Sequence, residues 1–222
     1  MNIASNLKKI NSEIGSATLV AVSKTKPLEA IREAYEAGQR IFGENRAQEL
    51  QRKAEALPKD IEWHMIGHLQ SNKVKYIAPF VSLIHSVNNL RLLKEINKRA
   101  KQNDKIIKVL LQAFIAEEES KSGMEKEEIQ QLLENKDYSS MENIRVVGMM
   151  GMATFTDDQV KIKKEFSYLK EIYDNIKTNY FKNRDEFNIL SMGMSGDYKI
   201  ALDCGSNMVR IGSSIFGDRE YN

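Results

Sequence analysis

A lysine directly after an apolar strand is the first residue whose placement could do chemistry. Lys24 follows the apolar residues 19–22, separated from them only by Ser23. Burial disfavours the charged form of a lysine, so its pKa falls and its amine becomes nucleophilic. Such an amine can condense with an aldehyde to form an imine. The alternative is that Lys24 covers the strand with its methylene groups and directs its charge into solvent.

Two segments rich in glycine and serine could bind an anion. Residues 191–197 (SMGMSGD) place Ser195 and two glycines where a strand is expected to turn into a helix. Residues 210–214 (RIGSS) add Gly212 and Ser213. Backbone N–H groups and hydroxyls in such turns can face a phosphate. Ordinary helix-capping turns use the same residue types, so the pattern leaves both interpretations open.

Arg210 is a charged residue inside an apolar run. It lies between Val209 and Ile211, and the alternation of a strand puts its side chain on the opposite face from theirs. An inward-facing arginine needs a partner. That partner could be part of a bound ligand, or it could be a carboxylate in a structural ion pair.

The elements that would position these residues alternate along the chain. Short apolar, β-branched runs are each followed by a charged segment of helical character, which is typical of parallel strands with crossover helices. Helical spacing is present at residues 28–37, 90–101, 126–134 and 159–178. The eight strand candidates are residues 18–24, 40–44, 62–66, 82–87, 106–114, 144–150, 187–192 and 208–216.

Eight such units predict an α/β fold with a closed (β/α)8 barrel of the TIM type. An open doubly wound sheet, which more often has about five or six strands, is the alternative. We expect residues 1–222 to form this single domain, because about 200 to 250 residues suffice for such a barrel. Functional residues of the fold gather at the C-terminal ends of the strands. Lys24, Asn45 and the 191–197 turn all lie there.

The composition argues against several classes of protein. The 33 basic and 31 acidic residues give a net charge of +2, which predicts no nucleic-acid-binding face. Three scattered histidines and one cysteine predict neither a metal site nor a disulfide, and they favour a reducing, cytoplasmic compartment. No apolar stretch approaches the roughly 18 residues of a membrane span, so we expect no membrane association.

Five segments carry a family resemblance. The segments are AVSKTKP at 21–27, FGENRAQE at 42–49, WHMIGHLQSNK at 63–73, MGMSGD at 192–197 and GSNMVRIGSSIFG at 205–217. Through them the sequence resembles the pyridoxal phosphate homeostasis protein family over nearly its whole length. This resemblance implies a fold like the N-terminal barrel of alanine racemase, with pyridoxal 5'-phosphate (PLP) held as a Schiff base on the lysine that matches Lys24.

The resemblance also implies roles for five further residues, carried over one by one. Asn45 resembles the residue beside the cofactor ring. Ser195, Gly212 and Ser213 resemble the ligands of the cofactor phosphate. Arg210 resembles the arginine that faces the pyridine nitrogen.

Lys26 is the competing candidate for the reactive amine, because it shares strand parity with Lys24. Pro27 biases Lys26 toward an extended conformation and is well suited to the first position of the next helix. We therefore expect Lys26 at the helix entrance and nearer water, and Lys24 closer to the apolar strand.

The resemblance implies carriage of PLP in intracellular PLP homeostasis, without turnover. The alternative is a PLP-dependent amino-acid racemase, and a third class is an interaction module with a vestigial site. An arginine, which stays protonated, leaves the pyridine nitrogen neutral and so weakens the cofactor's action as an electron sink. The chain stops at Asn222, soon after the eighth strand, so we expect no second domain of the racemase kind. We expect a monomer that delivers PLP to PLP-dependent apoenzymes.

Overall fold

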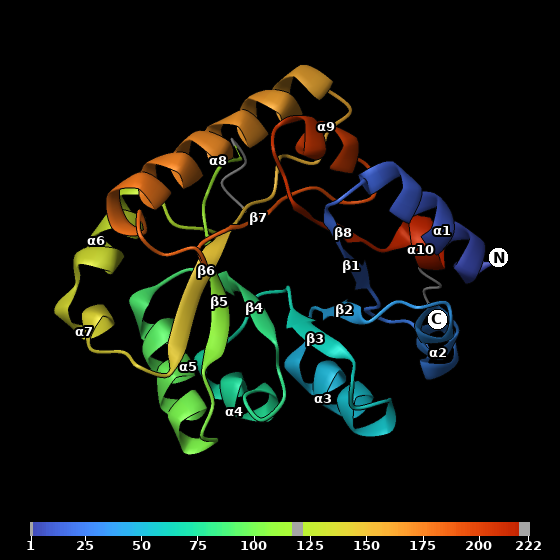
Figure 1. Ribbon diagram of the computed structural model, residues 1–222, viewed down its shortest axis with the longest axis horizontal. Coiled ribbons are helices and arrows are strands. Elements are labelled where there is room, and N and C mark those ends of the chain that lie inside the picture. Colours follow the sequence, from blue (N-terminus) through green and yellow to red (C-terminus); the bar gives the residue numbers. More distant parts are fainter. Residues whose placement is uncertain (1, 117–121, 218–222) are drawn as a thin grey trace.

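The computed structural model describes residues 2–116 and 122–217. Its eight strands are all parallel and form one closed barrel in chain order, with β8 pairing back to β1 (Figure 1). The predicted (β/α)8 barrel is therefore confirmed. The strands are β1 (Thr18–Val22), β2 (Ile41–Glu44), β3 (Glu62–Met65), β4 (Leu83–Val87), β5 (Ile107–Gln112), β6 (Ile144–Met150), β7 (Ile189–Ser191) and β8 (Met208–Ile211).

Helices connect the strands and cover the outside of the barrel. The longest, α8 (Gln159–Tyr180), buries Phe166, Leu169, Tyr173 and Ile176 at the spacing that predicted it. The others are α1 (Ile3–Ile14), α2 (Leu28–Glu36), α3 (Ala47–Ala56), η1 (Ser71–Lys73), α4 (Val74–Ile77), α5 (Leu90–Gln102), α6 (Lys126–Glu134), α7 (Lys136–Ser139), α9 (Tyr198–Asp203) and α10 (Ser213–Phe216).

The strands contribute to two separate cores because their side chains alternate. On β1, Leu19 and Ala21 face outward into the large core between barrel and helices, whereas Val20 faces inward. On β4, Ile84 faces outward and Leu83 inward. The inward residues form a second, smaller apolar cluster that fills the barrel, composed of Val20, Leu83, Leu110, Val147, Met150 and Met208.

Several predicted boundaries are wrong. The first strand ends at Val22, so Lys24 lies in the following turn. The eighth strand, predicted to reach residue 216, ends at Ile211, and residues Ser213–Phe216 form α10. In the range of residues described, no helix combines the length and the apolar character needed to cross a membrane.

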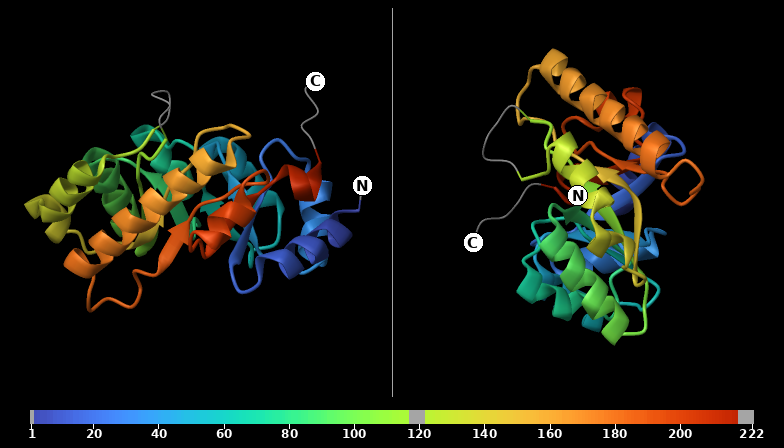
Figure 2. Two further views of the ribbon diagram at one scale, coloured as in Figure 1. Left: turned by 90° about the horizontal axis from the view of Figure 1, so that it is seen from above. Right: turned by 90° about the vertical axis from the view of Figure 1, so that its left-hand side faces the viewer.

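The N-terminal helix α1 was not predicted. It lies against α2 and α10 (Figure 2). Asn6 Nδ2 donates a hydrogen bond to the Ile215 carbonyl at 3.0 Å. The first and last helices of the described chain are therefore neighbours beside the seam where β1 meets β8. This seam is one wall of the site described next.

Candidate functional site

One cavity opens at the C-terminal ends of the strands, where a barrel of this kind places its functional residues. Its volume is about 650 Å³, within the range of small-molecule sites. Loops after β1, β2, β6, β7 and β8 line it. The structure brings all six predicted site residues to this cavity, namely Lys24, Asn45, Ser195, Arg210, Gly212 and Ser213.

Lys24 lies in a tight turn between β1 and α2. The turn is closed by a hydrogen bond from the Lys26 backbone N–H to the Ser23 carbonyl at 3.0 Å. Lys24 and Lys26 are both half-buried, and both line the cavity. Their burial does not separate them, so the position of Lys26 nearer water stays a prediction. Pro27 occupies the N-cap of α2, one position before the predicted one.

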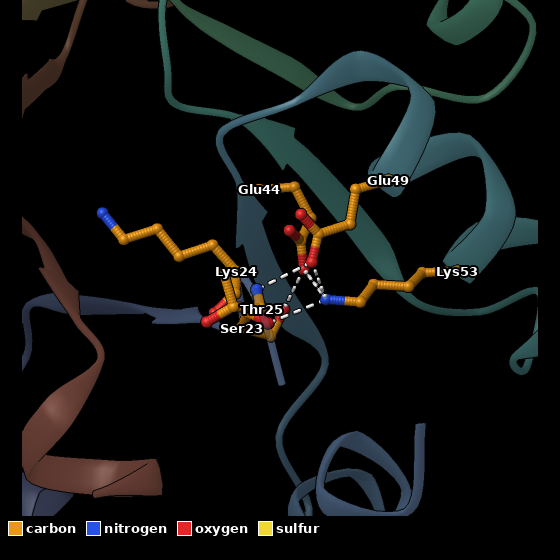
Figure 3. A network of polar contacts seen from close by, with 6 residues as sticks. All are labelled: Ser23, Lys24, Thr25, Glu44, Glu49 and Lys53. Carbon is orange, nitrogen blue, oxygen red and sulfur yellow. Dashed lines mark hydrogen bonds and ion pairs between the residues drawn. The ribbon is translucent and has the colours of Figure 1, made fainter. Parts of the chain in front are cut away.

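The amine of Lys26 is engaged on the wall of the cavity. Its Nζ donates a hydrogen bond to the Phe216 carbonyl at 3.0 Å. The Lys24 side chain extends away from the polar network behind its turn (Figure 3). The two lysines thus enter the same space with different surroundings.

Behind the Lys24 turn lies a buried cluster of charges (Figure 3). The Nζ of Lys53 on α3 donates to Glu44 Oε1 at 2.7 Å, to Glu49 Oε1 at 2.8 Å and to the Ser23 carbonyl at 2.8 Å. The hydroxyl of Ser23 donates to the same Glu44 oxygen at 2.6 Å. The sequence interpretation missed this cluster, although the four-residue spacing of Glu49 and Lys53 on a helix was a visible signal.

The pKa values of the two carboxylates in this cluster shift in opposite directions. Burial raises the pKa of Glu44, against the charge and hydrogen bond of Lys53. Partial burial alone would raise the pKa of Glu49, but hydrogen bonds from Lys53 and from the Thr25 N–H outweigh it, so that this pKa is lowered. Glu49 is therefore the carboxylate that stays ionised over the wider pH range.

Asn45, directly after Glu44, is held at the cavity by close backbone packing. A Cβ atom on Gly67 would come within 2.5 Å of the Asn45 carbonyl oxygen and 2.7 Å of its Cα. The Gly67 carbonyl in turn accepts a hydrogen bond from the hydroxyl of Ser86 at 2.6 Å. A glycine at position 67 is thus required to let the chain after β3 pass beside Asn45.

The opposite side of the cavity is built from the turns after β7 and β8. The Gly212 N–H donates to Ser195 Oγ at 3.2 Å, which leaves the hydroxyl proton of Ser195 able to donate to a ligand. Asp197 also lines the cavity, and its Oδ1 accepts the Met194 N–H at 2.5 Å, so this carboxylate closes its own turn. Gly193 has a φ of +96°, and a Cβ there would meet that of Ala201 at 2.7 Å.

Arg210 forms the floor of the cavity. Its guanidinium is buried and donates to the Ser191 carbonyl at 2.9 Å, to Ser191 Oγ at 2.7 Å and to the Gly151 carbonyl at 3.1 Å. The acceptors of these bonds are neutral, and the charge of Asp197 at the same cavity acts on the pKa of Arg210 against the effect of burial. Burial lowers the pKa of Arg210 to about 10, which keeps it protonated at neutral pH.

Two histidines continue the polar chain into the barrel. Ser191 Oγ lies 3.2 Å from His85 Nδ1, and His85 Nε2 lies 3.0 Å from His64 Nδ1. Because arginine only donates, Ser191 must accept from Arg210 and can donate to His85, which then donates to His64. Burial lowers the pKa of His64 to about 3 and that of His85 well below its ordinary value. Both histidines are neutral at neutral pH.

The sequence interpretation also missed the loop after β6. Thr154, Phe155, Thr156 and Asp157 line the cavity, and Phe155 is 95% exposed. Both oxygens of the buried Glu165 bind Thr154, at 2.6 Å to its N–H and 2.7 Å to its hydroxyl. Residues of this kind occur in any surface turn, so no sequence signal separates them.

Comparison with known proteins identifies the family. The model of the family described as "Alanine racemase, N-terminal domain" matches residues 1–220. The pyridoxal phosphate homeostasis protein of Aquifex aeolicus is 41% identical over 207 residues, which cover 92% of this chain and 88% of the relative. The chain belongs to the pyridoxal phosphate homeostasis protein family. A member from Vibrio alginolyticus is 37% identical and aligns over 100% of this chain and 99% of its own.

Solved structures agree with this assignment. PipY of Synechococcus elongatus PCC7942, solved with PLP bound, is 32% identical and superposes with a TM-score of 0.88 over 97% of this chain and 100% of its own. Alanine racemase of Bartonella henselae, with covalently bound pyridoxal phosphate, is 15% identical and has a TM-score of 0.71. This chain covers 61% of that racemase. At this identity the likeness shows the shared fold alone.

Proposed function

We propose that this chain binds PLP in the cavity, holds it as a Schiff base on Lys24, and acts in intracellular PLP homeostasis by carrying and releasing the cofactor. The observation that carries the proposal is the meeting of all six predicted residues at one cavity of about 650 Å³. Membership of the pyridoxal phosphate homeostasis protein family and the PLP-bound structure of PipY support it.

The cavity fits the chemistry of the cofactor. PLP supplies an aldehyde that condenses with an amine, and Lys24 offers that amine on one side. On the other side, Ser195 and Ser213 offer their hydroxyls to the phosphate, and the turn at Gly212 offers backbone groups. Arg210, held from below by Ser191 and Gly151, presents a cation to the ring between them. A cationic donor at the pyridine nitrogen keeps that nitrogen unprotonated.

The placement of Arg210 favours carriage over turnover. An arginine at the pyridine nitrogen leaves that nitrogen neutral, which weakens the cofactor as an electron sink. Arg210 lines the cavity, which supports this interpretation. We further propose that the protein works as a monomer in the cytoplasm and supplies PLP-dependent apoenzymes. Its single cysteine supports a reducing compartment.

The test is an absorption spectrum of the purified protein with PLP, before and after borohydride reduction. The unmutated protein and Lys26→Ala should both show the imine band and a reduced adduct that resists dialysis. Lys24→Ala should show neither. Peptide mapping that places the reduced adduct on Lys26 in the unmutated protein would overturn the assignment of Lys24.

A further inference from the structure

Thr25, the residue after the reactive lysine, has an unusual backbone. Its φ is +64°, in the left-handed region that β-branched residues rarely adopt. It occupies the third position of the turn closed by the Lys26 N–H and the Ser23 carbonyl. Glycine is usual at that position of a turn when φ is positive. Such a conformation persists only where neighbouring structure holds it.

Helix α3 supplies what holds the turn. The Thr25 N–H donates to Glu49 Oε1 at 2.7 Å, and the Ser23 carbonyl accepts from Lys53 Nζ at 2.8 Å. Glu49 and Lys53 also bind one another, so the residues on either side of Lys24 are tied to one ion pair on one helix. The Thr25 hydroxyl donates to the Lys24 carbonyl at 2.6 Å and completes the turn (Figure 3).

Lys53 has a different role from Lys24, although both lie near the same turn. Its side chain is 7% exposed and its amine donates to three oxygens. Those bonds direct its amine at the turn. Lys24 lines the cavity and extends away from the cluster (Figure 3). The cluster therefore contacts the backbone around Lys24, whose side chain lines the cavity.

We propose that Glu49 and Lys53 are positioning residues that hold the turn at residues 23–26, so that the Lys24 amine enters the cavity where the cofactor aldehyde binds. The inference rests on the proposed function, because it assigns a task to the turn that carries the imine. Glu44 joins the same cluster from the end of β2, so the cluster also fixes the segment that leads into Asn45.

A double-mutant cycle tests this role. The variants are Glu49→Ala, Thr25→Gly and the two combined, with Glu55→Ala as the matched control, an exposed glutamate on the same helix. The readout is the rate at which the imine band rises after apoprotein is mixed with PLP. Loss of a hydrogen bond to a charged group predicts that Glu49→Ala slows this rate about 10-fold to 100-fold, while Glu55→Ala leaves it unchanged.

The glycine background separates positioning from a general loss of structure. Glycine adopts positive φ without support, so in the Thr25→Gly background Glu49→Ala should slow imine formation by less than about 3-fold. Equal slowing in both backgrounds, or no slowing by Glu49→Ala alone, would overturn the inference.

Amide hydrogen exchange in ligand-free protein separates this inference from the proposed function. Peptides that span residues 19–28 should exchange faster in Glu49→Ala than in Glu55→Ala. If the unmutated protein forms no imine while this exchange difference is present, the proposed function fails and the tie between α3 and the turn stands. If exchange is the same in both variants, the positioning role is refuted.

Discussion

Removing the two hydroxyls that we assign to the phosphate should separate the affinity for PLP from that for pyridoxal. The change is Ser195→Ala with Ser213→Ala. Hydrogen bonds to a charged group contribute about 1.5 to 3 kcal/mol each when well enclosed. Ser195 is half-buried, whereas Ser213 is exposed, so its bond to a phosphate competes with water. We therefore expect a total loss of about 2 to 4 kcal/mol, or roughly 30-fold to several hundred-fold in the dissociation constant of PLP.

Equilibrium dialysis against both ligands measures the difference. Pyridoxal has the same aldehyde but no phosphate, so its retention by the double variant should change less than about 3-fold. Ser206→Ala is a suitable control, because the buried hydroxyl of Ser206 donates to the Met192 carbonyl at 2.8 Å and, unlike those of Ser195 and Ser213, does not line the cavity. Equal weakening of PLP and pyridoxal would refute the assignment of these serines to the phosphate.

Three further predictions concern the interior of the barrel and its rim. Because the folded pKa of His64, about 3, lies below its ordinary value of 6.5, the folded protein resists protonation there, and stability should fall as pH drops below about 6.5. Urea unfolding measures the free energy of unfolding at pH 7.5 and at pH 5.0. Between these pH values it should fall by about 2 kcal/mol more in the unmutated protein than in His64→Gln. An equal fall in both proteins would contradict this prediction. Gly193→Ala should lower the free energy of unfolding by about 1 to 3 kcal/mol, because position 193 has a positive φ and the added Cβ would meet Ala201. A change within about 0.5 kcal/mol would count against this explanation. Arg210→Glu, in protein that stays folded and loaded with PLP, should raise the slow exchange of an amino acid's α-proton followed by NMR in deuterated water; unchanged exchange would remove the electronic argument for carriage.

The barrel could be predicted from the sequence because apolar residues recur at different spacings in its strands and in its helices. Inward and outward residues alternate on each strand, and α8 keeps its apolar face over its whole length. Reading an apolar run as a strand failed at residues 213–216. There the chain turns at Gly212, and the apolar Ile215 and Phe216 are buried as part of helix α10. Helix α1 was predictable from Ile3, Leu7, Ile10 and Ile14, whose spacing is helical.

The cavity was predictable only where the chain placed unusual residues at strand ends. Lys24 and Arg210 stand out because charge interrupts apolar runs. Phe155 does not, because an exposed aromatic in a loop has no period that marks it. The buried cluster of Glu44 and Lys53 also escaped prediction, since it joins a strand to a helix and its members look like surface charges when read singly.

The pairing of β1 with β8 determines when this site can form during synthesis of the chain. Thr18 pairs with Met208 and Ala21 with Ile211, so the barrel closes only when residues nearly two hundred positions apart meet. Lys24 lies in the turn after β1, and Gly212 lies in the turn after β8. The two sides of the cavity therefore come together through the pair of strands that are farthest apart in the sequence. A ribosome-bound chain that has released only β1 to β7 has the reactive amine but lacks the turn opposite it. The pocket is therefore completed only after β8 and α10 have been synthesised, when α10 can lie beside α1.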